Sequence, residues 1–196
     1  MAEPALPKLY SGKVRDIYDA GDDRLLMVTS DRFSAFDVVL NEAITDKGRV
    51  LTAMSAFWFE KFADLIRGHL IATDGPEITE LGIAEDDPDL AGRIMLTHKA
   101  EMLPIECIVR GYITGSAWKE YQASGTMNDA PLPSGLLESS QLPEPVFTPS
   151  TKAEVGDHDE NISYERAVDL IGTELAERAR DVSLRIYQEG AAWASE

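Results

Sequence analysis

The chain has 196 residues, of which 44% are hydrophobic and 27% charged, and its 35 acidic and 18 basic side chains give a formal net charge of −17. This length allows one large domain or two small ones with a hydrophobic core. So negative a surface repels a phosphate backbone, which argues against a nucleic-acid partner. No apolar run is long enough to cross a membrane, and the first residues do not resemble a signal peptide.

The single cysteine, Cys107, falls in a hydrophobic segment. One cysteine cannot form an internal disulfide, and a chain without disulfides is typical of a reducing compartment. We therefore expect a cytoplasmic protein in which Cys107 is buried and chemically inert.

Short strands and one helix are predicted for the first half of the chain. Residues 13–18 and 24–29 are rich in β-formers and flank a turn-forming cluster, which predicts a β-hairpin. Further strands are expected at residues 38–40, 70–72, 94–97 and 105–109. An amphipathic helix of about five turns, ending at Gly68, is indicated by apolar residues that recur every three or four positions: Leu51, Met54, Trp58, Phe62 and Leu65.

The second half is predicted to be extended and then helical. A short helix is expected at residues 116–124, whereas residues 131–149 contain five prolines and should be extended. A helix at residues 164–171 breaks at Gly172, and Thr173 is a plausible N-cap for a longer helix. We expect that last helix to bury one apolar stripe: Leu175, Ala179, Val182, Ile186 and Trp193.

Two polar segments in the first half are candidates for ligand binding. In residues 10–18, Gly12 allows backbone amides to approach a phosphate, and Lys13 and Arg15 alternate toward one face. Taken alone, this segment is better explained as a tight turn with two solvated cations, and it matches neither a Walker A loop nor a dinucleotide fingerprint. Residues 29–37, with Ser30 and Asp31, form either a ligand-binding loop at a strand end or an Asx-type turn with a local ion pair.

Two further candidates lie in the second half. In residues 103–116 a strand ends at Arg110 and leads through Gly111 and Gly115 to Ser116, a combination suited to phosphate recognition. Ser116 could also be a helix N-cap, which is compatible with an anion site. Residues 147–161 hold a lysine, a histidine and several carboxylates. They form a solvated loop or a ligand site, and a metal site at His158 is disfavoured because adjacent residues cannot all face one ion.

Taken together and in this order, four segments resemble the recurring blocks of the SAICAR synthetase (phosphoribosylaminoimidazole-succinocarboxamide synthase) family: GKVRDIY, SDRFSAFD, LPIECIVRGYITGS and FTPSTKAEVGDHDEN. The resemblance implies an α+β fold with an antiparallel N-terminal sheet and a second α+β domain, whose nucleotide site is related to those of protein kinases and ATP-grasp ligases. We place the two domains at residues 1–103 and 104–196, the second of them truncated.

The same resemblance implies an ATP-dependent ligase. It would join the carboxylated aminoimidazole ribonucleotide CAIR to L-aspartate, giving SAICAR, ADP and phosphate through an acyl phosphate. ATP and Mg²⁺ would be the cofactors, the partners would be these small molecules, and self-association is expected because part of the last helix should lack its covering sheet. The family's metal-binding carboxylate falls in a later block that this sequence lacks, so no metal ligand is assigned.

The resemblance also assigns roles to individual residues. The ATP phosphates or the adenine would be lined by six residues: Gly12, Lys13, Val14, Arg15, Lys99 and Met102. CAIR or aspartate would be bound by Ser30, Asp31, Arg32, Arg110, Ser116 and His158. Of these, Arg110 and Ser116 would bind the CAIR phosphate. Acting in catalysis would be Lys152, Glu154 and Asp159.

Two other functions fit the same residues. A small-molecule kinase with a related nucleotide site would differ by being indifferent to aspartate. A nucleotide-binding module without catalysis would differ in the length of its reading frame, since the enzyme requires the later blocks.

Overall fold

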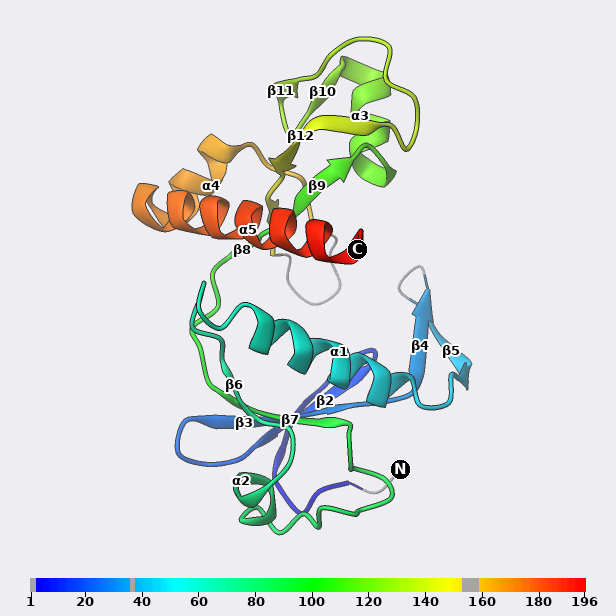
Figure 1. Ribbon diagram of the computed structural model, residues 1–196, viewed down its shortest axis with the longest axis vertical. Coiled ribbons are helices and arrows are strands. Elements are labelled where there is room, and N and C mark those ends of the chain that lie inside the picture. Colours follow the sequence, from blue (N-terminus) through cyan, green and yellow to red (C-terminus); the bar gives the residue numbers. More distant parts are fainter. Residues whose placement is uncertain (1–2, 36–37, 153–158) are drawn as a thin grey trace. The chain divides into compact units, whose positions relative to one another are not determined.

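The computed structural model describes residues 3–35, 38–152 and 159–196. The chain divides into two compact units, Met1–Glu101 and Met102–Glu196, each of which combines strands and helices (Figure 1). The α+β architecture expected from the sequence is thereby confirmed. None of the helices in the described ranges has the length and apolar character needed to span a membrane.

A five-stranded antiparallel sheet forms the centre of the first unit, in the order β1-β2-β3-β7-β6. Its strands are β1 (Lys8–Ser11), β2 (Arg15–Asp19), β3 (Arg24–Thr29), β6 (Leu70–Ala72) and β7 (Ile94–His98). The predicted hairpin is β2 paired with β3. Its turn contains three consecutive residues with positive φ, Gly21, Asp22 and Asp23, which are residue types that tolerate this conformation.

The core of the first unit lies against one face of this sheet. Leu26 and Val28 alternate along β3 with less buried residues, and Leu96 lies on the neighbouring strand β7. Helix α2 (Pro76–Thr79) and the loop after it contribute Ile78 and Ile83 to the same cluster. Figure 1 shows α2 and the longer helix α1 over opposite faces of the sheet.

Helix α1 differs from its prediction in its ends and in part of its buried face: Phe62 is buried as predicted, but Met54 is not. It spans Lys47–Lys61, starting four residues earlier than expected and ending before Gly68. Thr52 is buried, whereas Met54 of the predicted stripe is 53% exposed. The cause is a close approach at Gly48, where a Cβ atom would lie 2.4 Å from the Thr29 carbonyl oxygen. This contact turns the Gly48 and Thr52 side of the helix toward the sheet.

Beside α1, a separate two-stranded sheet consists of β4 (Arg32–Ala35) and β5 (Val38–Ala43). The strand expected at residues 38–40 is therefore present, but it pairs outside the main sheet. All six residues of β5 are exposed.

The second unit is built from short strand pairs and three helices. Its strands are β8 (Ile105–Glu106), β9 (Val109–Tyr112), β10 (Thr126–Met127), β11 (Ala130–Pro131), β12 (Gln141–Phe147) and β13 (Ser150–Thr151), and its helices are α3 (Gly115–Ser124), α4 (Tyr164–Ile171) and α5 (Thr173–Ala194). Its core consists of Ile113, Ala117, Met127 and Leu142.

The single strand expected at residues 105–109 is in fact two strands with different partners. β8 pairs with β13, and β9 pairs with β12. Between them the Ile108 carbonyl accepts a hydrogen bond of 2.7 Å from the Thr148 amide. The proline-rich stretch, predicted to be extended, supplies β12, whose register with β9 is irregular.

Helix α4 has its predicted bounds, and α5 follows after a break at Gly172 as expected. The N-cap prediction was wrong by one residue: Gly172, with φ of 82°, is the cap, and Thr173 is already helical. The predicted stripe on α5 is only half buried, and Leu175 and Trp193 at its two ends are exposed. Instead Ala176 is the buried residue of this helix.

Candidate functional site

The loop from Gly12 to Val14 is held by the guanidinium of Arg32. Its Nε donates to the Lys13 carbonyl and its Nη2 to the Gly12 carbonyl, both at 3.1 Å. The Gly12 amide is itself bonded to the Arg15 carbonyl at 2.7 Å. A Cβ on Gly12 would lie 3.1 Å from that same oxygen, so a larger residue would crowd the turn. The loop is therefore fixed from within the protein.

Asp16 completes this arrangement beneath the loop. It is buried, and Arg32 Nη2 donates to its Oδ1 at 2.9 Å while the Ser11 hydroxyl donates to the same oxygen at 2.6 Å. Burial favours the neutral carboxyl, but the bonds from Arg32 and Ser11 outweigh it and lower the pKa of Asp16. Arg32 is thus neutralised by a carboxylate and serves to position the loop.

The predicted phosphate-binding cations, Lys13 and Arg15, are both exposed. On β2 the side chain of Arg15 lies on the face opposite to Asp16 and Tyr18, which are buried. Arg15 has no ion pair or hydrogen bond from its side chain within the described part of the chain. The geometry leaves its guanidinium available to an anionic ligand, and the ATP role of both residues stays a prediction.

Ser30 and Asp31, which sequence analysis assigned to the substrates, are engaged in internal contacts. The Ser30 amide and hydroxyl both donate to the Val14 carbonyl, at 2.9 Å each. Asp31 forms a two-pronged ion pair with Arg93, in which Nη2 donates to Oδ2 at 2.9 Å and Nη1 donates to Oδ1. Ser30 thus connects the end of β3 to the loop from Gly12 to Val14 by two hydrogen bonds.

The carboxylate of Asp31 also accepts hydrogen bonds from the backbone at the start of α1. The Gly48 amide donates to Oδ1 at 2.9 Å and the Asp46 amide to Oδ2 at 3.2 Å. The bonds from Arg93 hold the pKa of the Asp31 carboxyl well below its usual value, and the two amides add to this effect against a smaller cost of burial. Asp31 therefore accepts hydrogen bonds from backbone N–H groups at the start of α1, although it lies 15 or more positions earlier in the sequence.

Lys99 and Met102, predicted to border the adenine, follow strand β7. The Lys99 amide donates to the Asp23 carbonyl at 2.7 Å, and its ammonium lies 3.5 Å from Asp19. Met102 is 68% exposed. Lys99 belongs to the first unit and Met102 to the second.

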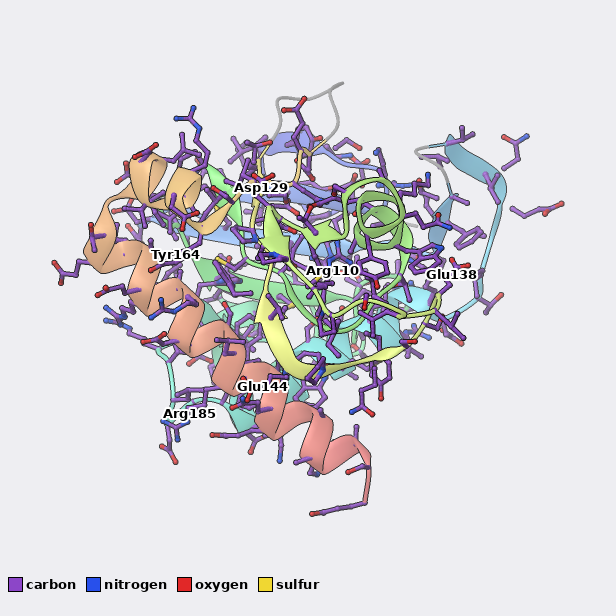
Figure 2. The ribbon with its side chains drawn as sticks, turned by 90° about the horizontal axis from the view of Figure 1, so that it is seen from above. Arg110, Asp129, Glu138, Glu144, Tyr164 and Arg185 are labelled. Atoms are coloured by element: carbon purple, nitrogen blue, oxygen red, sulfur yellow. The ribbon has the colours of Figure 1, made fainter. Side chains whose placement is uncertain are left out.

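In the second unit the structure brings together Arg110 and Ser116, the two residues predicted to hold a phosphate. Arg110 Nη2 donates to the Ser116 hydroxyl at 3.3 Å, and the Asn161 side-chain amide donates to the same oxygen at 3.4 Å. The Nε of Arg110 is buried and has no hydrogen-bond partner among the described residues. We call these three residues the Arg110 cluster (Arg110 is labelled in Figure 2).

The elements around the Arg110 cluster explain its composition. Arg110 lies within β9, not at its end, and pairs with Val146 of β12. A Cβ on Gly111 would lie 2.0 Å from the Tyr187 hydroxyl, so glycine lets α5 pack on this strand. The alternative in which Ser116 caps α3 was wrong, because Thr114 is the cap and Ser116 is in the first turn. Its hydroxyl therefore lies at a helix N-terminus, where anions are favoured.

Asn161 was not singled out in the sequence, although it ends the fourth resembling block. It forms an isolated bridge with Ser150, next to β13. The Thr151 amide donates to the Glu160 carbonyl at 2.9 Å, which joins the two ends of the loop between them. The hydrogen bond from its side chain holds Asn161 beside Ser116 in the Arg110 cluster, and no local pattern signals it.

Of the predicted catalytic residues, the structure describes Lys152 and Asp159. The Lys152 ammonium is 3.4 Å from Glu106, in an exposed ion pair, and Asp159 is exposed. Glu154 and His158 lie outside the described residues. The catalytic role of Lys152, Glu154 and Asp159 stays a prediction.

Cys107 is not the buried residue that was expected. It is exposed, because it falls in the link between β8 and β9 and not inside one continuous strand. Partial burial of its sulfur raises the pKa of the thiol, and a hydrogen bond with Ser183 opposes this. A raised pKa lowers the fraction of reactive thiolate at neutral pH, and the expected lack of reactivity stays a prediction.

No three His, Cys, Asp or Glu side chains gather into a metal-binding group within residues 3–35, 38–152 and 159–196. The described residues alone therefore do not form a protein cage for Mg²⁺, an ion that usually takes ligands from nucleotide phosphates as well.

Comparison with known proteins gives one consistent answer. The family described as SAICAR synthetase matches residues 8–196. Two curated relatives are phosphoribosylaminoimidazole-succinocarboxamide synthases, from Pelobacter propionicus at 59% identity over 184 residues and from Geobacter sulfurreducens at 56% over 185 residues. Each alignment covers 94% of this chain and 62% of the relative.

Solved structures agree with these relatives. A SAICAR synthase from Saccharomyces cerevisiae, complexed with SAICAR, is 42% identical with a TM-score of 0.84, and the match covers 94% of this chain and 62% of that one. A second SAICAR synthase is 41% identical with a TM-score of 0.86, covering 97% and 63%. The chain thus spans somewhat less than two thirds of the length of the proteins it matches.

Proposed function

The chain belongs to the SAICAR synthetase family, and from this premise we propose that it forms the nucleotide-binding and CAIR-binding part of an ATP-dependent ligase. The ligase joins CAIR to L-aspartate and yields SAICAR, ADP and phosphate. The relatives support this reaction by their names, and the yeast structure supports it by the SAICAR in its title.

The observation that carries the proposal is the Arg110 cluster. It combines a guanidinium with a buried Nε that has no partner in the described chain, a serine hydroxyl and an asparagine amide, all within one unit. These groups suit a phosphate monoester, because a guanidinium binds phosphate oxygens in pairs and the neutral donors add hydrogen bonds. CAIR carries such a phosphate on its ribose.

The reaction we propose has two steps. An oxygen of the CAIR carboxylate attacks the γ-phosphorus of ATP, the bond to the β-phosphate oxygen breaks, and ADP leaves. The aspartate amine then attacks the acyl carbon of the resulting acyl phosphate, inorganic phosphate leaves, and the amine loses a proton. Both substrates are polyanions, so positioning and charge neutralisation are the main tasks of the protein.

The residues would divide these tasks. Gly12, Lys13, Val14 and Arg15 would contact the ATP phosphates, and the Arg110 cluster would hold the CAIR phosphate. Lys152 and Asp159 would lie near the reacting carboxylate and aspartate. Ser30, Asp31 and Arg32 would act by holding the ATP loop and α1 in place, since their polar groups are already bonded inside the first unit.

Mg²⁺ is included in the proposal as a companion of the ATP phosphates. It would supply positive charge to the phosphates, and its protein ligands are not assigned among the described residues. A cytoplasmic location and self-association remain parts of the proposal. They are supported by one unpaired cysteine and by the exposed ends of the apolar stripe on α5.

The test is calorimetric titration of the 196-residue chain with CAIR. Arg110→Lys should weaken binding roughly tenfold to a hundredfold, as expected for losing a charge-assisted bond of about 1.5–3 kcal/mol. The matched control is Arg185→Lys on α5, an exposed arginine paired with Glu189, which should leave the affinity unchanged (Figure 2). Equal affinity of the wild type and Arg110→Lys would refute the assignment of the phosphate.

The kinase alternative is separated by aspartate. The test uses a hybrid that joins this chain to the remaining part of the Pelobacter propionicus relative. With ATP and CAIR, this hybrid should form SAICAR and release ADP continuously only when aspartate is present. A phosphorylated CAIR-like product that accumulates equally with and without aspartate would favour the kinase.

A further inference from the structure

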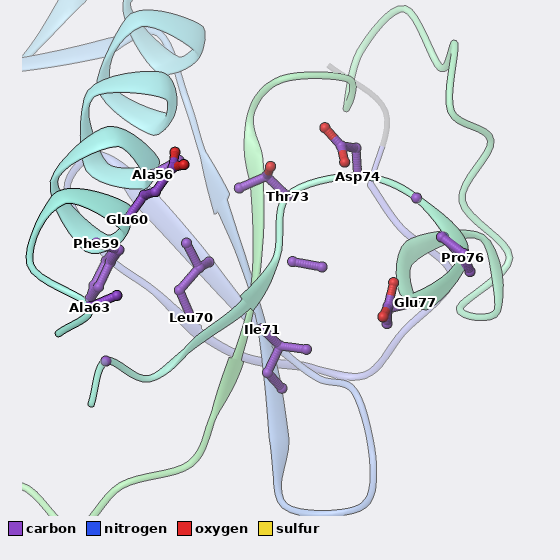
Figure 3. A pocket seen from close by; sticks show the side chains of 13 residues that line it. Ala56, Phe59, Glu60, Ala63, Leu70, Ile71, Thr73, Asp74, Pro76 and Glu77 are labelled. Atoms are coloured by element: carbon purple, nitrogen blue, oxygen red, sulfur yellow. The ribbon is translucent and has the colours of Figure 1, made fainter. Parts of the chain in front are cut away.

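A groove of about 540 Å³ lies in the first unit, between α1, β6 and the start of α2 (Figure 3). Its apolar lining comes from Ala56, Phe59, Ala63, Leu70, Ile71 and Ala72. None of the residues predicted to bind ATP, CAIR or aspartate lines it. The proposed function therefore does not use this groove.

The floor of the groove is built on a fixed aromatic ring. Phe59 meets His69 edge-on, with 5.0 Å between the ring centroids. A Cβ on Gly68 would lie 2.8 Å from the Phe59 ring, so the chain after α1 passes directly against it. The adjacent side chains of Ala56 and Ala63 are small and leave space above the helix.

One wall of the groove is a strand edge. β6 is the outermost strand of the five-stranded sheet, so one of its edges has no neighbouring strand among the residues that the structure describes. Such an edge presents backbone donors and acceptors that another extended chain can pair with. All three residues of β6 line the groove, which places this edge and the apolar floor side by side.

The rim of the groove is acidic. Glu60 lies on α1, and Asp74 and Glu77 lie at the end formed by the loop into α2, as Figure 3 shows. All three are exposed, and none has an ion pair or side-chain hydrogen bond with any residue in the described ranges. No basic residue lines the groove. Three unneutralised carboxylates around an apolar floor favour a ligand that is both cationic and apolar.

We propose that this groove is a docking site for a basic, extended segment of a partner protein, which adds to the sheet as a sixth strand beside β6. Its backbone pairs with the open edge of β6. Alternate side chains reach the floor over Phe59 and Ala63, and lysine or arginine side chains meet Glu60, Asp74 and Glu77. The open edge and the acidic rim are independent features, and together they select an extended cationic peptide over a compact ligand.

The probe is a capped pentapeptide of alternating lysine and valine, titrated into the ¹⁵N-labelled 196-residue chain and followed by amide chemical shifts. The shifts should change in β6, in the second half of α1 and in residues 73–77, and binding should weaken as salt rises. Two control peptides separate the contributions. One replaces lysine with glutamate, and the other carries N-methyl groups on alternate amides, so that it keeps its charge but cannot pair as a strand.

Two sets of variants complete the test. The double variant Glu60→Lys, Glu77→Lys should weaken binding at least tenfold, whereas Glu85→Lys, an exposed charge reversal outside the groove in the same unit, should not. Equal binding of the N-methylated peptide would overturn strand addition. No binding of the lysine–valine peptide, or shifts confined to other surfaces, would overturn the docking site and leave the carboxylates as a guard against aggregation of a sheet edge.

Discussion

The ion pair between Asp31 and Arg93 gives the sharpest prediction, because sequence analysis placed Asp31 with the substrates and the structure places it at the base of α1. The side chain of Arg93 is only 9% exposed. Removing the carboxylate leaves this buried charge with only the longer ion pair to the exposed Asp46, at 3.7 Å, and breaking a buried pair typically costs about 3–5 kcal/mol. The two amides at the start of α1 would also lose their acceptor, at about 1 kcal/mol as for a lost helix cap.

We therefore expect Asp31→Ala to destabilise the first unit by about 3 kcal/mol or more, near the lower limit because Asp31 is itself partly exposed. Asp31→Asn keeps an acceptor oxygen and the shape of the side chain while losing the charge, so about 1–2 kcal/mol is expected. The matched control is Asp22→Asn, whose side chain is 90% exposed and paired with Arg24 at the hairpin turn. It should change stability by less than about 0.5 kcal/mol.

The assay is urea unfolding without ligands, followed through the amide signals of β3 and β7 so that only the first unit is observed. The carboxyl of Asp31 has a lower pKa in the folded chain than in the unfolded one. Its contribution is present above the unfolded value of about 4 and is lost as pH falls below it. Asp31→Asn should thus unfold at lower urea at pH 7 and show a smaller further loss on acidification. Coincident urea unfolding curves for Asp31→Asn and Asp22→Asn would refute the structural role of Asp31 and favour its predicted role in substrate binding.

Three further predictions follow from single contacts. Arg15→Ala should weaken ATP binding roughly tenfold while leaving CAIR binding within about twofold, because the guanidinium has no partner within the described chain; the reverse pattern in calorimetry would assign Arg15 to CAIR. Cys107 should be labelled by a thiol reagent in the folded chain at pH 7, and more slowly than cysteine in a short peptide, since the pKa of its thiol is raised; labelling only after unfolding would show that it is buried. Ser163→Ala should destabilise α4 by about 1 kcal/mol in hydrogen exchange, because the serine hydroxyl accepts from the Arg166 amide at 3.2 Å, and an unchanged exchange rate would show that this cap is dispensable.

Elements determined by neighbouring residues could be predicted from the sequence. The β2–β3 hairpin depends on a turn of Gly21, Asp22 and Asp23, and α4 depends on a cap at Ser163 and a break at Gly172. In each case the decisive residues lie within a few positions of the element. The physical causes are local, namely backbone conformations that only some residues tolerate and amide groups that a nearby side chain satisfies.

Elements determined by distant residues could not be predicted in the same way. Asp31 and Arg93 are 62 positions apart, and their pairing fixes where α1 begins. The split between β8 and β9 depends on partner strands some 40 positions later in the chain, as the bond from Thr148 to Ile108 shows. Both are contacts in space that leave no period or motif in the sequence, and the exposed position of Cys107 is a direct consequence of the second.

The same distinction separates the cations that can act on ligands from those that cannot. In a chain with a net charge of −17, Arg15, Arg32 and Arg110 are all candidates for binding anionic substrates, Arg15 for ATP and the other two for CAIR or aspartate. Arg32 is neutralised by the buried carboxylate of Asp16. Arg15 and Arg110 have no carboxylate partner among the described residues, and the partner of Arg110 is the neutral hydroxyl of Ser116. A cation that is already paired would have to exchange one anion for another at little gain. We therefore propose that Arg15 and Arg110 contribute more than Arg32 to binding the two polyanionic substrates, while Arg32 holds the loop that precedes Arg15.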